Sequence, residues 1–298
     1  MDSKLEDTRK RFEKGWLGWG NLCQFQVSGD ECVPERYKQD NNDNQTANFA
    51  LLPSIPVIDF ALLNNGDAEE LNKLDFACKE WGFFLACFRL LHDFIHNIVN
   101  HGAAAEVLSN VKAASTEIQK VTEEILANMS VLMGMDSNGL KRLHGDMKQY
   151  IMNYYPPCSR PDLVLGVSPH SEGGSLTVLL QDNDITGLQI KYKGSWIPVK
   201  PIPNALVVNM GDLAWSNVLY RSIEHRAVMN AKRTRMSIAT FLFADDEAEI
   251  GPVESMTCDR RRIYRKVKHL DYIRHRLGRK MDGKANLYFL KLESESFG

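Results

Sequence analysis

The chain has 298 residues, a formal net charge of −2 and 44 % hydrophobic residues. This composition is typical of a soluble globular protein and excludes a collagen-like repeat, a coiled-coil rod and disorder throughout the chain. The small net charge excludes a strong global attraction to nucleic acid or to acidic membranes. Six cysteines without a CxxC pair predict reduced thiols, and the sequence shows neither a secretory signal nor a run of about 18 apolar residues. We therefore expect a cytoplasmic protein.

The first half of the chain predicts a small number of elements. Residues 1–53 are polar and carry little periodicity, which predicts an extension ahead of the folded body. Residues 55–60 form a short apolar run that predicts a strand. A capping-box pattern followed by apolar residues at helical spacing predicts a helix over 67–81. A second apolar stripe predicts a helix over 115–133 that ends at Gly134.

The second half has a different texture. From residue 150 onward, short runs rich in Val, Ile, Leu and Thr alternate with turn residues at roughly ten-residue intervals, which predicts an antiparallel sandwich or jelly roll. Ten Lys and Arg residues lie between Arg260 and Lys280, in a segment whose apolar spacing predicts a helix over 260–278. Nucleic-acid binding is one interpretation of this basic run. The solvated face of a helix that packs on the body is the favoured one.

Two histidines and a carboxylate form a candidate metal site. His170 and Glu172 are two residues apart, so their side chains point the same way on an extended segment, and His225 follows on a later predicted strand. Two histidines and one carboxylate are the ligand set of non-haem Fe(II) oxygenases, in which one face of the metal stays open. His92 and His96 have a spacing that can bind metal, but an ordinary amphipathic segment explains them better.

A candidate anion site follows the last histidine. Residues 231–234 are polar and predict a turn between two strands. A hairpin at this turn would place His225 opposite Arg235, with Ser237 on the same face. A dicarboxylate could then chelate the metal at one end, while Arg235 and Ser237 hold its other carboxylate.

Nine segments together resemble the plant 2-oxoglutarate- and Fe(II)-dependent dioxygenases, in particular the SRG1-like, norcoclaurine-synthase-like and codeine-demethylase-like members. The resemblance covers most of the chain from residue 54 to the end. It rests on IPVIDF (55–60), DFACKEWGFF (75–84), VNHG (99–102), MNYYPPCSRPDLVLG (152–166), SPHSEGGSLTVLLQ (168–181), GLQI (187–190), NMGD (209–212), YRSIEHRAV (220–228) and RMSIATF (235–241).

The resemblance implies a mixed α+β fold with a double-stranded β-helix, or jelly roll, at its core and helices packed outside. It implies an enzyme that uses O2 to decarboxylate 2-oxoglutarate and to oxidise a small aromatic or alkaloid-like plant metabolite by hydroxylation, demethylation or a related step. The implied cofactors are Fe(II) and 2-oxoglutarate, with ascorbate as reductant. The alternative is a catalytically impaired relative that keeps the fold and binds a ligand or a partner.

The resemblance also implies the iron ligands, which are His170, Glu172 and His225. Glu172 stands where the family has Asp, and its extra methylene moves the carboxylate by about 1.5 Å. Glu172 either ligates after an adjustment of the loop, since two glycines follow it, or ligates poorly. Because the family supplies Asp at this position, we expect Glu172→Asp to raise the turnover of 2-oxoglutarate.

The residues implied for 2-oxoglutarate lie on two of the matching segments. Arg235 and Ser237 would hold its distal carboxylate, and Tyr155 would donate a hydroxyl to the same molecule. Asn153 would sit beside the metal.

Two departures from the family change the scaffold. Residues 85–98 separate WGFF from VNHG as an insertion. An internal segment is also missing, so that residues 114–116 directly join the helix expected after VNHG to the helix predicted over 115–133. The expected divisions are an N-terminal extension (1–53), an N-terminal dioxygenase region (54–116, with the insert 85–98), a connecting helix (117–146), the Fe(II)/2-oxoglutarate jelly-roll domain (147–245) and a C-terminal helical extension (246–298).

Overall fold

The computed structural model describes residues 54–88, 104–144, 148–181, 185–212, 216–258, 261–277 and 285–292. The predicted extension over 1–53, most of the insertion and the histidine pair at 92 and 96 lie outside these ranges. Among the described residues, no helix is both long and apolar enough to cross a membrane.

The N-terminal elements follow the sequence pattern closely. The predicted first strand is β1 (Val57–Asp59), and short helix α2 (Phe60–Asn64) follows it directly. The predicted second element is α3 (Ala68–Phe76), which continues into one π-helical turn, η4 (Ala77–Trp81). As the capping box predicts, the Asp67 carboxylate accepts a hydrogen bond from the backbone N–H of Glu70 at 2.9 Å.

Gly82 ends this helical segment and starts strand β2 (Phe83–Cys87). Its φ is +60°, and a Cβ atom at this position would lie 2.0 Å from the backbone oxygen of Arg221. Only glycine fits both conditions, because other residues resist positive φ and would clash with this carbonyl. The close approach brings the start of β2 next to the segment that leads to His225.

The long helix α5 (Ala104–Leu132) is confirmed as a helix, but it begins earlier than the prediction of 115–133. It runs without a break through residues 114–116, where the sequence predicts a direct junction of two helices. Gly134, with a φ of +71°, follows its end, and the short helix α6 (Gly139–His144) comes next. Four residues of the predicted stripe are buried, namely Ile118, Val121, Ile125 and Met129.

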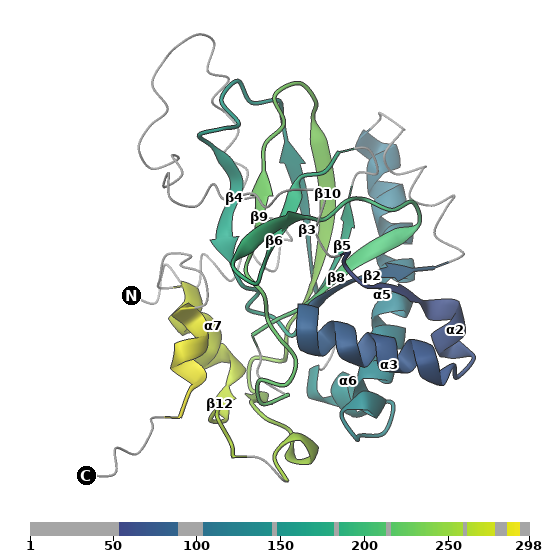
Figure 1. Cartoon of the computed structure of the whole chain (residues 1–298), viewed down its shortest axis with the longest axis vertical. Coiled ribbons are helices and arrows are strands. Elements are labelled where there is room, and N and C mark those ends of the chain that lie inside the picture. Colours follow the sequence, from purple (N-terminus) through teal and green to yellow (C-terminus); the bar gives the residue numbers. More distant parts are fainter. Residues whose placement is uncertain are drawn as a thin grey trace.

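Eight further strands complete two facing sheets, as Figure 1 shows. The larger, six-stranded sheet has the order β1-β2-β8-β5-β10-β3, and the smaller, four-stranded sheet has the order β4-β9-β6-β7. All pairs are antiparallel except β1 with β2, so the predicted jelly-roll core is confirmed. The bounds are β3 (Lys148–Tyr155), β4 (Leu165–His170), β5 (Leu176–Gln181), β6 (Leu188–Tyr192), β7 (Ser195–Pro198), β8 (Ala205–Met210), β9 (His225–Val228) and β10 (Arg235–Leu242).

Two apolar clusters hold these layers together. The first lies between the outer face of the large sheet and the helices, which cover that face on the right of Figure 1. It joins Ile118 and Ile125 of α5 to Val178 and Val208 of the sheet. The second lies between the two sheets and includes Phe83, Leu85, Ile190, Ile197 and Val207. Alternating side chains of the large sheet therefore serve two different cores.

The hairpin predicted between the last two strands is wrong. β9 pairs with β4 and β6 in the small sheet, whereas β10 pairs with β3 and β5 in the large sheet. The chain crosses from one sheet to the other through residues 229–234, where the Asn230 side chain accepts hydrogen bonds from two following backbone N–H groups. Because the two strands lie in different sheets, His225 is not opposite Arg235.

The C-terminal helix is shorter than the prediction of 260–278. Helix α7 (His269–Leu277) follows two short strands, β11 (Glu249–Ile250) and β12 (Val267–Lys268). In the segment before this helix, the backbone of Arg261 and Ile263 forms hydrogen bonds with the side chain of Asn217. These bonds replace the helical ones, so the chain there stays extended. The segment is completed by two 3-10 turns, η5 (Glu254–Met256) and η6 (Ala285–Leu290).

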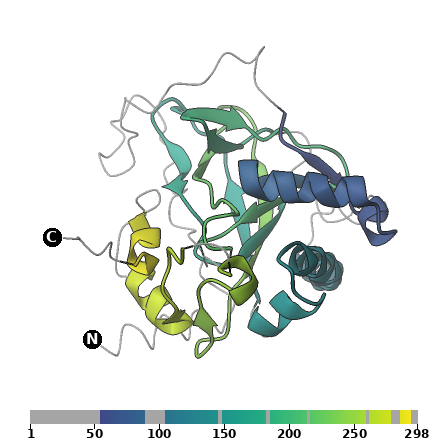
Figure 2. The same ribbon diagram turned by 60° about the horizontal axis from the view of Figure 1, so that its bottom comes forward.

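Helix α7 packs against the body, as Figure 2 shows from below. His269 and Tyr272 are 1 % and 0 % exposed. Most of the described basic residues of this region are exposed, as expected for a solvated face; they are Arg261, Arg262, Arg265, Lys266, Lys268 and Arg274.

Candidate metal centre

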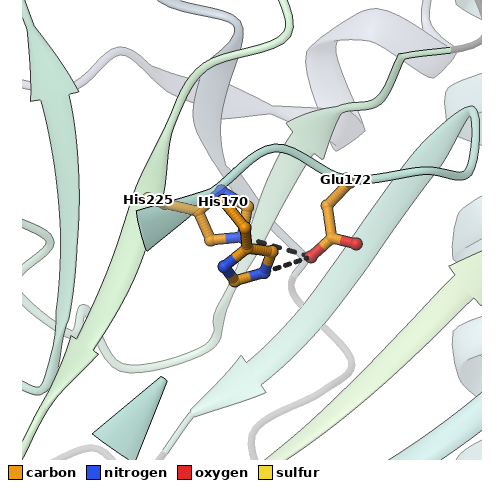
Figure 3. Close-up of side chains that lie close together, drawn as sticks. All are labelled: His170, Glu172 and His225. Atoms are coloured by element: carbon orange, nitrogen blue, oxygen red, sulfur yellow. Dashed lines mark hydrogen bonds and ion pairs between the residues drawn. The ribbon is translucent and has the colours of Figure 1, made fainter. Parts of the chain in front are cut away.

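The two histidines come from neighbouring strands of the small sheet. His170 is the last residue of β4 and His225 is the first residue of β9, and the two are opposite each other in the antiparallel pair. Register shifts between Leu165 and His170 mark an irregular β4. Their ring centroids are 4.3 Å apart. Residues far apart in the sequence therefore present adjacent imidazoles at one end of the sheet (Figure 3).

Glu172 lies on the loop that follows β4. Its Oε1 atom lies 3.1 Å from His225 Nε2 and 3.4 Å from His170 Nε2. One ligand atom from each residue falls within 4.8 Å of the other two, and Figure 3 shows the carboxylate pointing at both rings. The side chains of Glu172 and His225 are 9 % and 8 % exposed. The structure thus brings together the three residues that the sequence proposes as ligands.

The other nitrogen of each ring faces a backbone carbonyl. His170 Nδ1 lies 2.8 Å from the oxygen of Ser168, and His225 Nδ1 lies 3.1 Å from the oxygen of Ile223. A carbonyl can only accept, so these contacts assign the proton of each neutral imidazole to Nδ1. The Nε2 lone pairs then point at the Glu172 carboxylate, which is the arrangement that metal-binding histidines commonly have.

This geometry fits a divalent cation. Burial, followed by the neighbouring His170, lowers the pKa of His225, so its ring is neutral at physiological pH. Burial by itself raises the pKa of Glu172, but its interactions with the two histidines outweigh burial and hold this pKa below its usual range, so the carboxylate is anionic. When no proton occupies Nε2 of either ring, this anionic oxygen faces two nitrogen lone pairs. A cation among them turns this repulsion into coordination, and two histidines with one carboxylate suit Fe(II).

One wall of the centre is apolar. The ring of Phe83, which is fully buried, meets the His225 ring edge-on with 5.4 Å between centroids. Phe83 belongs to the cluster between the sheets. Bulk water is therefore kept from this side of the His225 ring, which strengthens electrostatic interactions there.

The proposed anion-binding residues lie on the large sheet. In the register of β10 with β3, Arg235 is opposite Tyr155 and Ser237 is opposite Asn153. The Arg235 guanidinium lies 5.1 Å from the centre of the Tyr155 ring. Arg235, Ser237 and Tyr155 are 3 %, 4 % and 8 % exposed, and Asn153 is half-buried. The structure brings these four residues together, although not through the hairpin that the sequence predicts.

Two further residues shape the surroundings of Arg235 and were missed by the sequence analysis. Gln181 is opposite Ser237 on the other side of β10, and its Oε1 accepts a 3.4 Å hydrogen bond from Arg235 Nη2. Gly187 leaves room for the arginine, because a Cβ atom there would lie 2.5 Å from Arg235 Cδ. Their proximity to Arg235 follows from the way the strands are arranged, and no local sequence pattern indicates it.

Comparison with known proteins identifies the family. Residues 147–244 match the 2OG-Fe(II) oxygenase superfamily, and residues 55–127 match the N-terminal region described as non-haem dioxygenase in morphine synthesis. Protein SRG1 of Arabidopsis thaliana is 32 % identical, over 87 % of this chain and 92 % of the relative. The chain belongs to the 2-oxoglutarate- and Fe(II)-dependent oxygenases.

A second relative supports the family, and a solved structure shows the same fold. Codeine O-demethylase of Papaver somniferum is 30 % identical over 87 % of this chain and 92 % of its own length. The crystal structure of JOX2 in complex with 2OG, Fe and JA shares the fold, with a TM-score of 0.77, 23 % identity and coverage of 89 % of this chain and 96 % of that one. As an oxygenase of this family, the protein uses 2-oxoglutarate and O2 as cosubstrates and Fe(II) as cofactor, and it acts on a small molecule.

Proposed function

We propose that this oxygenase oxidises a small aromatic or alkaloid-like metabolite, with His170, Glu172 and His225 as its iron ligands. The convergence of Glu172 Oε1 on the two Nε2 atoms carries the proposal. Fe(II) bound at this centre supplies the activation of O2 that is coupled to the decarboxylation of 2-oxoglutarate. The substrate class is supported by relatives named codeine O-demethylase and oxoglutarate-dependent flavonoid 7-O-demethylase 1, the latter 28 % identical.

In this proposal Arg235 binds the distal carboxylate of 2-oxoglutarate. A guanidinium offers two parallel N–H donors to a carboxylate, and its burial strengthens the ion pair. Ser237 and Tyr155 each donate a hydroxyl hydrogen to the same cosubstrate, and the Tyr155 ring holds the guanidinium in place. Asn153, opposite Ser237, sits beside the metal and orients what is bound there.

The proposed divisions of the chain assign these parts to one jelly-roll domain over 147–245. An N-terminal region over 54–116 adds β1 and β2 to the large sheet, and its helices, with a connecting helical segment over 117–146, cover the outer face of that sheet. Residues 246–298 form a C-terminal extension, and residues 1–53 an N-terminal one. The match of residues 147–244 to the 2OG-Fe(II) oxygenase superfamily supports the bounds of the jelly-roll domain. We further propose that the enzyme works in the cytoplasm with ascorbate as reductant and without a nucleic-acid partner.

A product assay tests this function. The protein is incubated with Fe(II), ascorbate, 2-oxoglutarate and a panel of O-methylated flavonoids and benzylisoquinolines, and succinate and formaldehyde are measured. We expect succinate formation that rises with one class of compound, with formaldehyde in equal amount where the reaction is a demethylation. His225→Ala is the matched control. Succinate formation no higher than in this control would contradict the proposal and favour the non-catalytic alternative, which no observation on the described residues supports.

A further inference from the structure

A buried polar cluster lies behind the loop that carries Glu172. It consists of Ser171 on this loop, Asp212 after β8, and Tyr272 and Arg276 on α7. In Figure 1, α7 lies below the end of β4, so the C-terminal helix reaches the metal centre from outside the jelly roll. None of these four residues belongs to the proposed ligand set.

Asp212 holds the loop on both sides of the Glu172 α-carbon. Its backbone N–H donates to the backbone oxygen of Glu172 at 2.8 Å. Its Oδ2 accepts from the Ser171 hydroxyl at 2.7 Å and lies 3.5 Å from the Tyr272 hydroxyl. Asp212 is 1 % exposed, so these bonds do not compete with bulk water.

Arg276 holds the same loop through the loop backbone. Its Nη2 donates to the backbone oxygen of Ser171 at 3.0 Å, and its Nη1 lies 3.9 Å from Asp212 Oδ2. The guanidinium sits directly on Gly173, where a Cβ atom would lie 2.3 Å from Nη1. The positive charge of Arg276 also offsets the proximity of two carboxylates, those of Asp212 and Glu172.

Gly211, which precedes Asp212, packs against the backbone of the metal loop. A Cβ atom at Gly211 would lie 2.0 Å from the backbone oxygen of Gly174 and 3.2 Å from that of Glu172. The segment before Asp212 therefore touches the metal loop backbone to backbone. Between this segment and Arg276, the loop has little freedom to shift toward or away from the histidines.

We propose that Arg276, together with Asp212, is a positioning residue that fixes the backbone of residues 171–174 so that the Glu172 carboxylate reaches both histidines. A glutamate has one more rotatable bond than an aspartate, so its carboxylate converges on the metal only when its backbone is held at the correct distance. Metal affinity thus depends on the C-terminal helix. This inference rests on the proposed function of the three ligands.

The test compares two arginines of the same helix. Arg276→Met removes the bond to Ser171, whereas Arg274→Met removes an exposed arginine that lies 3.6 Å from Asp271 on the same helix. Each purified full-length variant is titrated with Fe(II) under anaerobic conditions, and its thermal unfolding is recorded without metal. We expect Arg276→Met to weaken Fe(II) binding roughly 10- to 100-fold, as the loss of groups that support metal ligands commonly does. Arg274→Met should stay within twofold of the parent.

The outcomes separate positioning from simple helix docking. Arg276→Lys keeps the charge beside Asp212 but not the planar fork, so it should restore part of the affinity. If Arg276→Met lowers the unfolding temperature but binds Fe(II) within twofold of the parent, the residue only docks the helix and the inference is wrong. If Arg276→Met does not fold, Gly173→Ala takes its place, because its Cβ displaces the same guanidinium, and an unchanged affinity there overturns the inference. A parent protein that binds no Fe(II) overturns the proposed function as well.

Discussion

The two ends of the site are held in different ways. At the metal end (His170, Glu172 and His225), the proposed ligands come from the ends of two strands of the small sheet and from a loop. At the arginine end (Arg235, Ser237 and Tyr155), every residue lies on one of two adjacent strands of the large sheet. A continuous ladder of eight residue pairs joins those strands, from Arg235 with Tyr155 to Leu242 with Lys148.

This difference indicates which substitutions should affect binding at each end of the site. Strand pairing sets the positions at the arginine end, so the identity of a side chain decides binding there. At the metal end, the position of Glu172 depends on contacts from Asp212 and Arg276, which lie far away in the sequence. Changes outside the ligand set should therefore affect metal binding much more than cosubstrate binding.

The largest effect is expected from removal of a ligand. His225→Ala leaves two ligands for the metal, and we expect Fe(II) affinity to fall by more than about 100-fold, beyond the loss caused by supporting groups alone. Anaerobic titration monitored by calorimetry measures this. One equivalent of Fe(II) bound as tightly as in the parent would show that His225 is not a ligand.

A large but separate effect is expected at the arginine end. Arg235→Lys replaces a planar fork by a point charge and should weaken 2-oxoglutarate binding by about 1.5–3 kcal/mol, since one of two hydrogen bonds to a charged carboxylate is lost. Fe(II) affinity should change little, because strand pairing holds β10 in place. Arg233→Lys, at an exposed position two residues earlier, is the matched control. Equal losses in both variants would contradict the role of Arg235.

A smaller effect is expected from Glu172→Asp, and its sign differs from the sequence-based expectation. The family pattern predicts a gain in turnover. In the structure, however, the Glu172 carboxylate already reaches both histidines. The aspartate carboxylate would lie about 1.5 Å further from them, and the fixed backbone cannot move closer to compensate. We therefore expect weaker Fe(II) binding and less succinate per minute. Higher turnover than the parent would mean that the loop adjusts freely.

The smallest effect concerns pH. Burial lowers the pKa of His225. In the folded protein without metal, the His225 ring is therefore mostly neutral at pH about 6.5, where an ordinary imidazole is half protonated. The unfolded chain binds this proton and the folded chain does not, so stability should fall as the pH drops below about 6.5. Urea unfolding at several pH values, with His225→Gln as the control, measures this contribution. The same slope in both proteins would contradict it.

The sequence predicts much of the core and misses what is assembled at a distance. Local periodicity predicts α3, α5 and the strand segments, and ligand chemistry predicts His170, Glu172 and His225 as one group, which the structure brings together. The pairing of β10 was mispredicted, because a polar turn looks the same whether the chain folds back or crosses to another sheet. Arg276 went unnoticed for a related reason: nothing in a basic segment reveals which arginine lies under Ser171.

The position of β10 has a consequence for how the protein folds during its synthesis. β3 is an edge strand of the large sheet, and β10 is its partner there. During synthesis, β3 leaves the ribosome long before residues 235–242. The backbone N–H and C=O groups of β3 that pair with β10 therefore stay unpaired until β10 has been made. A chain that stops short of residue 235 would present β3 and one side of β5 as open edges, which invite pairing with other chains. Refolding by dilution should also be prone to aggregation, because β3 and β10 are far apart in the sequence and their pairing completes both the sheet and its arginine end.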